Sequence, residues 1–131
     1  MNIKILLITI MLLNINCSEN LVNSENNAPI IFSLTAFPEV IEPADSVIII
    51  CNAMDPDGDT LVYDWITDGR VKIKGANDFD HFLYNTYENS RIVYPKNLNL
   101  LPDTLWVQCF ARDVKGKSAN SIVLFIVKQG N

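Results

Sequence analysis

The sequence has few residues of the kinds that build metal or catalytic centres. Its 131 residues include three cysteines and one histidine, and no Cys-x-x-Cys pair occurs. A structural zinc site needs four clustered nitrogen or sulfur ligands, which disfavours zinc. A glycine-rich phosphate loop and a metalloprotease motif are also missing. His81 follows the carboxylates of Asp78 and Asp80, but no nucleophile with a supporting motif accompanies it. We therefore expect no enzyme activity.

Basic residues are scarce as well. Ten Lys and Arg stand against 15 Asp and Glu, for a formal net charge of −5. Removal of the N-terminal stretch that carries Lys4 would leave −6. An acidic surface repels phosphate backbones, which argues against nucleic-acid binding. It argues equally against the folded domain binding anionic lipid.

The chain has one apolar run near its start, and that run is short. Ile5–Leu13 is too short to cross a bilayer comfortably as a permanent helix. A positively charged start, here Lys4, followed by a short apolar run is the architecture of a secretory signal. The following Leu13-Asn-Ile-Asn-Cys17-Ser resembles a bacterial lipoprotein cleavage site, in which the cysteine becomes the lipidated first residue. The resemblance implies a signal peptide over 1–16, a lipid on Cys17, and a location in the cell envelope, at the outer membrane or the cell surface. The alternatives are a secreted or periplasmic protein cleaved elsewhere, or an uncleaved N-terminal anchor.

The polar residues 17–28 predict a flexible tether, and residues 29–128 predict one folded domain. Within the domain, short runs of alternating or β-branched residues are separated by Pro, Gly, Asn and Asp, and no run has a convincing helical period. The predicted strands are 30–37, 40–41, 46–53, 61–67, 70–74, 79–87, 91–94, 103–113 and 121–127. The segments 79–87 and 91–94 are the weaker candidates, and we expect an all-β sandwich of seven to eight strands.

The period of two assigns faces to the strongest strands. If Cys51 points inward, so do Val47, Ile49 and Ala53. Trp65 inward brings Leu61 and Tyr63 with it. On the strand 103–113, the inward set is Leu105, Val107, Cys109 and Ala111.

Cys51, Trp65 and Cys109 resemble, in order and role, the inter-sheet bridge and packing tryptophan of immunoglobulin domains. More specifically, Asp55-Pro-Asp-Gly-Asp-Thr-Leu-Val-Tyr-Asp-Trp65, with Ala111-Arg-Asp-Val-Lys-Gly116, resembles the PKD and related immunoglobulin-like repeats of bacterial surface proteins. The resemblance implies a Greek-key immunoglobulin-like sandwich, a Cys51–Cys109 disulfide and Trp65 packed against it. The alternative for the two cysteines is a pair of reduced core thiols.

The acidic turn is the sharpest candidate for chemistry. Asp55, Asp57 and Asp59, with Asp113 as a further donor, offer hard oxygen ligands that suit calcium. An EF-hand is excluded, because Gly58 and Ile66 occupy the fourth and twelfth positions of such a loop. The alternative is that Asp, Pro and Gly simply build the turn, with Asp55 capping its own backbone. No other cofactor is expected.

A second candidate is a surface formed by outward side chains. Trp106 and Phe110 alternate with the inward set on one strand, and Val62 and Ile66 do so on its expected neighbour. Exposed aromatic side chains suit protein partners or stacking on sugar rings. The alternative is that a loop or the tether covers them, or that a bulge reverses the register.

These observations favour a surface-anchored binding or adhesion module with a protein or glycan ligand. The alternative is a structural accessory subunit of an envelope complex that binds no soluble ligand.

Overall fold

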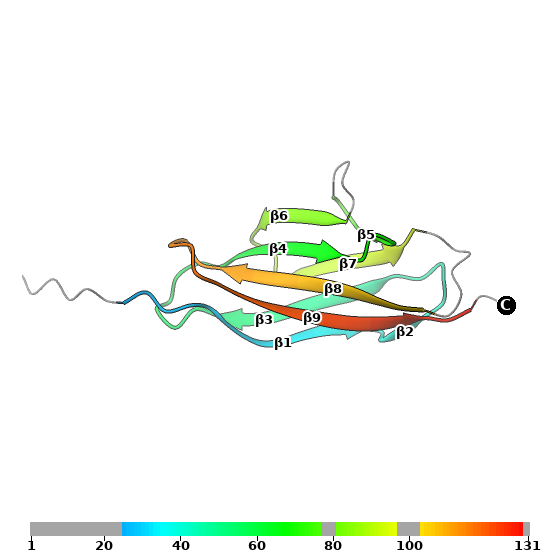
Figure 1. Ribbon diagram of the computed structural model, residues 1–131, viewed down its shortest axis with the longest axis horizontal. Coiled ribbons are helices and arrows are strands. Elements are labelled where there is room, and N and C mark those ends of the chain that lie inside the picture. The colour runs from blue at the N-terminus through cyan, green and yellow to red at the C-terminus, as the bar shows by residue number, and fades with distance from the viewer. Residues whose placement is uncertain (1–24, 77–80, 97–102, 130–131) are drawn as a thin grey trace, which may run out of the picture.

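The computed structural model describes residues 25–76, 81–96 and 103–129. In these ranges the chain forms nine strands and no helix, arranged as two sheets stacked face to face (Figure 1). The prediction of an all-β sandwich is confirmed. Cys17 and the predicted signal peptide lie outside the described residues.

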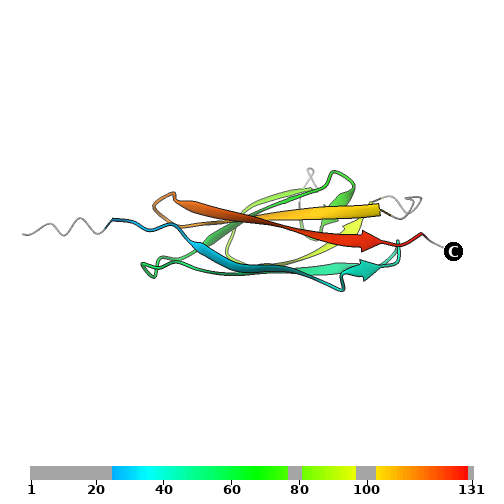
Figure 2. The same ribbon diagram turned by 60° about the horizontal axis from the view of Figure 1, so that its bottom comes forward.

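The smaller sheet has four strands, in the spatial order β1 (Ile30–Phe37), β3 (Val47–Met54), β7 (Ser90–Pro95) and β5 (Val71–Ile73). The larger sheet has five, in the order β2 (Val40–Ile41), β9 (Ser118–Val127), β8 (Asp103–Arg112), β4 (Val62–Thr67) and β6 (Phe82–Thr86). Among the described strands, every connection except β8–β9 crosses from one sheet to the other, as in the Greek-key connectivity of immunoglobulin-like sandwiches. Viewed after a 60° turn, β9 (orange to red) of the larger sheet lies above β1 (blue to cyan) of the smaller one (Figure 2).

The number of strands exceeds the predicted seven to eight because short segments also pair. The first predicted strand breaks at Pro38, as expected, and its two parts join different sheets. β1 pairs antiparallel with β3, whereas β2 pairs parallel with the end of β9. A proline cannot donate to a ladder, so the break falls where the chain leaves one sheet for the other.

Strand boundaries differ from the predicted ones mainly in β9. It begins at Ser118 rather than Ser121, because Ser118 pairs with Arg112 at the start of the β8–β9 hairpin. Residues 118–120 (Ser-Ala-Asn) carry little hydrophobic signal, and their strand conformation comes from the neighbouring ladder. Similarly, β6 is shorter than the predicted strand 79–87, of which residues 79 and 80 lie outside the described residues.

The core occupies the space between the sheets and follows the predicted alternation. On β3, Val47, Ile49 and Cys51 are buried, whereas Ile48 and Ile50 are 44% and 43% exposed. The inward residues of β8 are all completely buried. The core consists of Ala36, Ile41, Val47, Ile49, Cys51, Tyr63, Trp65, Val71, Ile73, Val93, Leu105, Val107, Cys109, Ala111, Phe125 and Val127.

Trp65 is the largest completely buried side chain. It lies on β4 directly opposite Cys109 of β8, and its ring centroid is 6.3 Å from that of Tyr63. Since register partners on neighbouring strands point to the same face, the indole and the Cys109 side chain enter the core side by side.

Cys51 and Cys109 are buried free thiols that meet from opposite sheets. A hydrogen bond with Cys51, together with burial, raises the pKa of the Cys109 thiol well above its usual range. The same hydrogen bond lowers the pKa of the Cys51 thiol, and both side chains are completely buried in the core. The disulfide between them stays a prediction.

Oxidation of this pair is expected in the exported protein. A Cys51–Cys109 bridge would close a loop of nearly sixty residues and stabilise the fold by about 3–4 kcal/mol through the lost entropy of the unfolded chain. Intact mass of the exported protein, with and without reductant and alkylation, measures the bridge. Denaturant unfolding in the two states measures its free energy, and the double substitution Cys51→Ala with Cys109→Ala is the matched control. Two alkylatable thiols in freshly exported protein would contradict the prediction.

Candidate functional site

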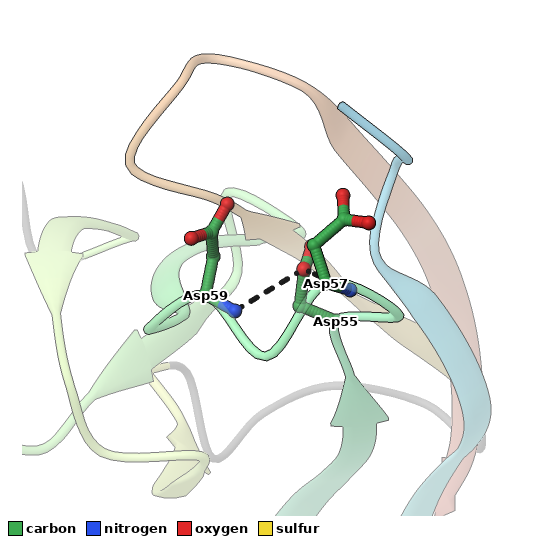
Figure 3. A group of neighbouring side chains, drawn as sticks. All are labelled: Asp55, Asp57 and Asp59. Carbon is green, nitrogen blue, oxygen red and sulfur yellow. Dashed lines mark hydrogen bonds between the residues drawn. The ribbon is translucent and has the colours of Figure 1, made fainter. Parts of the chain in front are cut away.

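The acidic turn Asp55–Asp59 joins β3 to β4 at one end of the sandwich (Figure 3). Asp55 is 5% exposed, and its Oδ1 accepts hydrogen bonds from the backbone N–H of Asp57 (2.9 Å) and Asp59 (3.2 Å). Gly58 lies at the tip with a φ of +78°, a left-handed conformation that favours glycine. Asp55 therefore builds the turn, as the capping interpretation holds.

The same carboxylate also has an oxygen that the turn does not use. Asp55 Oδ2 is buried and has no hydrogen-bond partner. Asp55, Asp57 and Asp59 each offer one oxygen, and these three oxygens lie within 4.8 Å of one another. A buried carboxylate oxygen without a donor is costly, so it favours a cation at this position.

A second carboxylate, Asp113, lies at the neighbouring β8–β9 turn and is 1% exposed. Its Oδ1 accepts from the backbone N–H of Lys115 (2.8 Å) and Lys117 (2.9 Å), the same device that Asp55 uses. Burial by itself would raise the pKa of Asp113, but these bonds and one from Asn26 outweigh it and hold the pKa below its usual value.

The residues before β1 lie against both acidic turns. Asn27 donates to Asp57 from its backbone N–H (2.6 Å) and its side-chain amide (2.8 Å), and these bonds lower the pKa of Asp57. Asn26 donates from Nδ2 to Asp113 Oδ2 (2.9 Å), while its own Oδ1 is buried without a partner. The predicted tether 17–28 thus ends in residues that contact the domain.

Sequence reasoning did not assign a role to Asn26 and Asn27. The signal lies in the topology, because the start of β1 pairs with the end of β3, at Ile30 and Met54. The residues just before β1 therefore reach the turn that follows β3. The Asn26-Asn27-Ala28-Pro29 stretch places two amide side chains there.

A lysine balances part of the negative charge of the acidic turns. Lys115 Nζ lies 2.8 Å from Asp59 Oδ2, and the ion pair raises the pKa of the ammonium. The available donors are otherwise all oxygens: Asp55 Oδ2, the Asp57, Asp59 and Asp113 carboxylates, and Asn26 Oδ1. This set fits the hard cation Ca²⁺ and contains no nitrogen or sulfur ligand of the kind that zinc prefers.

The second candidate is the outer face of the five-stranded sheet, the side of that sheet turned away from the core. Trp106, Phe110, Val62 and Ile66 all lie on it and are partly exposed. Neither the β4–β8 nor the β8–β9 ladder shows a bulge, so the register is the predicted one. The residues before β1 that the structure describes run to the acidic turns instead.

This outer face extends further than the sequence indicated. β9 and β2 add aliphatic side chains that are between 43% and 58% exposed, namely Ile122, Leu124, Ile126 and Val40. β6 adds Phe82 and Tyr84, whose rings stack with centroids 6.0 Å apart. The sequence signal for this extension is that the last strand is apolar on both faces. A strand with one face exposed to water normally alternates apolar and polar residues.

Charged groups on the outer face occur as opposite pairs. Arg112 contacts Asp64 at 3.2 Å and donates to Asn85 Oδ1 at 2.8 Å. At the other end, Lys128 lies 3.5 Å from Glu42. Between the apolar side chains, Gln108 donates to Asn120 Oδ1 (3.1 Å), so the face is largely apolar and nearly neutral, although the chain as a whole is acidic.

The remaining chemistry is sparse. The backbone carbonyl of His81 accepts a hydrogen bond from the N–H of Thr67 (3.0 Å), and the imidazole ring of His81 lies against Phe82.

A shallow hollow of about 460 Å³ opens on the four-stranded sheet, lined by Ile48, Lys74, Glu88, Ser90, Arg91 and Ile92. The three described ranges contain no helix of the length and hydropathy needed to span a membrane.

Two solved structures have the same arrangement of strands. The PKD1 domain of Vibrio anguillarum Epp aligns with a TM-score of 0.54 and 17% identity, over 81% of this chain and 100% of the domain. The fold is that of a PKD-like β-sandwich. A structure of carbohydrate-binding modules from the β-sandwich superfamily aligns with a TM-score of 0.60 and 24% identity, over 82% of this chain and 37% of that one. No family model matches the sequence, and no curated protein matches it. At these sequence identities, the similarity of this PKD-like sandwich to the two structures concerns the fold alone. It does not identify a ligand.

The contacts of Asn26 and Asn27 predict a pH dependence. The pKa values of Asp57 and Asp113 are lowered from 3.8 in the folded chain, so their contribution to stability is present above that value and is lost as the pH falls through the lower folded pKa. Unfolding free energies of the wild type and Asn27→Ala should therefore differ at pH 6 and converge well below pH 3.8. Urea unfolding at a series of pH values measures this. A difference that is equal at every pH would show that Asn27 acts through packing instead.

Proposed function

We propose that this PKD-like sandwich is an exported, non-catalytic interaction module that binds a protein partner through the outer face of its five-stranded sheet. The observation that carries the proposal is the extent of that face. Monomeric soluble proteins rarely expose a contiguous apolar patch of this kind unless it binds something. Here such side chains come from all five strands of one sheet.

The composition of the face favours a protein over a sugar. Ile122, Leu124, Ile126 and Val40 present aliphatic groups, which gain from burial against apolar protein surface but offer nothing to hydroxyls. Trp106 lies at the centre beside Leu124, the position that binding hot spots commonly occupy. The self-paired charges of Arg112 and Asp64 avoid the cost of burying an unpaired ion.

A glycan ligand is the second candidate, because of the stacked Phe82 and Tyr84 pair at the β6 edge. Aromatic side chains stack on sugar rings. The likeness to carbohydrate-binding modules is consistent with this use of the fold. The alternative role of a structural accessory subunit would use the same face, permanently covered within one envelope complex.

Export and anchoring complete the proposal. The leader 1–16 and a lipid on Cys17 would place the domain outside the cytoplasm, at the outer membrane or cell surface of a bacterium. Such a location also provides the oxidising environment that a Cys51–Cys109 bridge requires. A secreted or periplasmic protein without the lipid would keep the same binding face.

We also propose a calcium site at the acidic turn. Asp55, Asp57 and Asp59 would hold the ion, with Asp113 and Asn26 as further oxygen donors. Support comes from the two buried oxygens that lack partners, Asp55 Oδ2 and Asn26 Oδ1. The ion would replace the Lys115 ammonium as the counter-charge, so the two cations compete.

The binding face predicts a specific loss of partner binding. Trp106→Ala should weaken binding by at least about tenfold, since a central aromatic anchor contributes about 2 kcal/mol or more, and should leave the fold intact. The matched control is Tyr94→Ala, a partly exposed aromatic residue on the outer face of the other sheet. Cross-linking in intact cells followed by mass spectrometry identifies the partner, and titration of the purified pair measures affinity. A glycan array with the same variants tests the second candidate. Equal losses for both variants, or unfolding of Trp106→Ala, would contradict the proposal.

Calcium binding is expected with an affinity typical of extracellular modules, a Kd of about 0.1–1 mM. Asp55→Asn should abolish the calorimetric signal, and Lys115→Met should strengthen binding because the competing ammonium is gone. Asp45→Asn, in an exposed turn outside the acidic cluster, is the matched control. Absence of heat at millimolar calcium in the wild type would end this proposal without affecting the binding face.

A further inference from the structure

Gln108 is a polar residue in the middle of the apolar outer face. It lies on β8, the central strand of the five-stranded sheet, between β4 and β9 (Figure 1). Its register partners on those two strands are Ile66 and Ile122. By the period of two, the next outward residues along β8 are Trp106 and Phe110. Gln108 therefore has an apolar neighbour on each of its four sides.

One hydrogen bond uses part of the Gln108 amide. Its Nε2 donates to Asn120 Oδ1 of β9 at 3.1 Å. Gln108 is partly exposed and Asn120 is exposed, so water reaches both amides in the free domain. Among the described residues, the Gln108 carbonyl oxygen and the NH2 group of Asn120 have no partner. If both amides were turned over, the pair would still keep one free oxygen and one free NH2 group.

The docking of an apolar partner surface on the outer face would remove this water. An amide that loses its water without gaining a protein partner destabilises the complex, because its hydrogen bonds are not replaced. Gln108 does not escape this cost, since its neighbours on all four sides belong to the face and it does not lie at the rim. A partner that binds here must therefore place hydrogen-bonding groups opposite Gln108.

The group opposite Gln108 is expected to be uncharged. The nearby charges on the same two strands, Arg112 and Asp64, already form an ion pair with each other. A charged group of the partner would be buried without a counter-charge, which costs more than the burial of a neutral group. The free oxygen and the free NH2 group of the pair require one donor and one acceptor, and a single amide group supplies both.

We propose that Gln108, together with Asn120, determines the specificity of the outer face by binding an uncharged amide group of the protein partner. This inference rests on the proposed binding face and adds the chemistry that the partner presents at its centre. The apolar neighbours contribute contact area but discriminate weakly among partners, whereas an amide pair between them disfavours any partner that leaves it unsatisfied. A single polar Asn in a coiled-coil core acts in the same way and costs stability.

Titration of the full chain with the purified partner identified by cross-linking in intact cells tests the proposal. Gln108→Leu should lower the association constant by about tenfold or more, because the partner amide loses its hydrogen bonds. The matched control is Asn52→Leu, which replaces an exposed amide on the outer face of the other sheet by the same apolar side chain. If apolar burial alone governed binding, Gln108→Leu would bind as tightly as the wild type or more tightly.

Asn120→Leu is a second variant, in case Gln108→Leu does not fold, and should also weaken binding. Circular dichroism verifies the fold of each variant. Binding by the folded variants that equals or exceeds that of the wild type overturns the inference, as does an equal loss in Asn52→Leu. A loss of binding by Trp106→Ala would in that case still support the binding face. No loss by Trp106→Ala would contradict the proposed function, and this inference with it.

Discussion

Trp65 fills the space between the two sheets beside two thiols that meet from β3 and β8. Most features of the molecule depend on this packing, because it fixes which side of each strand faces inward. A shift of one residue would turn Cys109 outward and bring its neighbours Gln108 and Phe110 into the core. The core therefore enforces the register, and the register in turn determines the composition of both outer faces.

The outer face of the five-stranded sheet is a consequence of that constraint. Its apolar residues occupy positions that the core excludes, and they stay exposed because the described chain places no further layer on them. Most sandwiches put polar side chains there. The presence of Ile122, Leu124 and Trp106 instead gives the domain a surface that water solvates poorly, which is the physical basis of the proposed binding to a protein partner.

The acidic end of the sandwich is determined by turn structure rather than by the core. Asp55 and Asp113 each cap the turn in which they lie, so their carboxylates are required for local structure whether or not an ion is present. Lys115 balances part of their charge, and Asn26 and Asn27 bring the preceding chain into contact with them. These contacts hold the segment that leads back toward Cys17 at the end of the domain opposite β2.

The sequence by itself determined the alternation of inward and outward residues on β3, β4 and β8, the burial of Trp65 and the turns at Asp55–Asp59 and Gly116. These follow from the period of two and from turn chemistry, which are local properties. Only the tertiary structure decided that β2 joins the other sheet, that β9 starts at Ser118, and that Asn26 and Asn27 meet Asp113 and Asp57. Each of these depends on which strands become neighbours, and neighbours are chosen by the packing of the whole core rather than by any one segment.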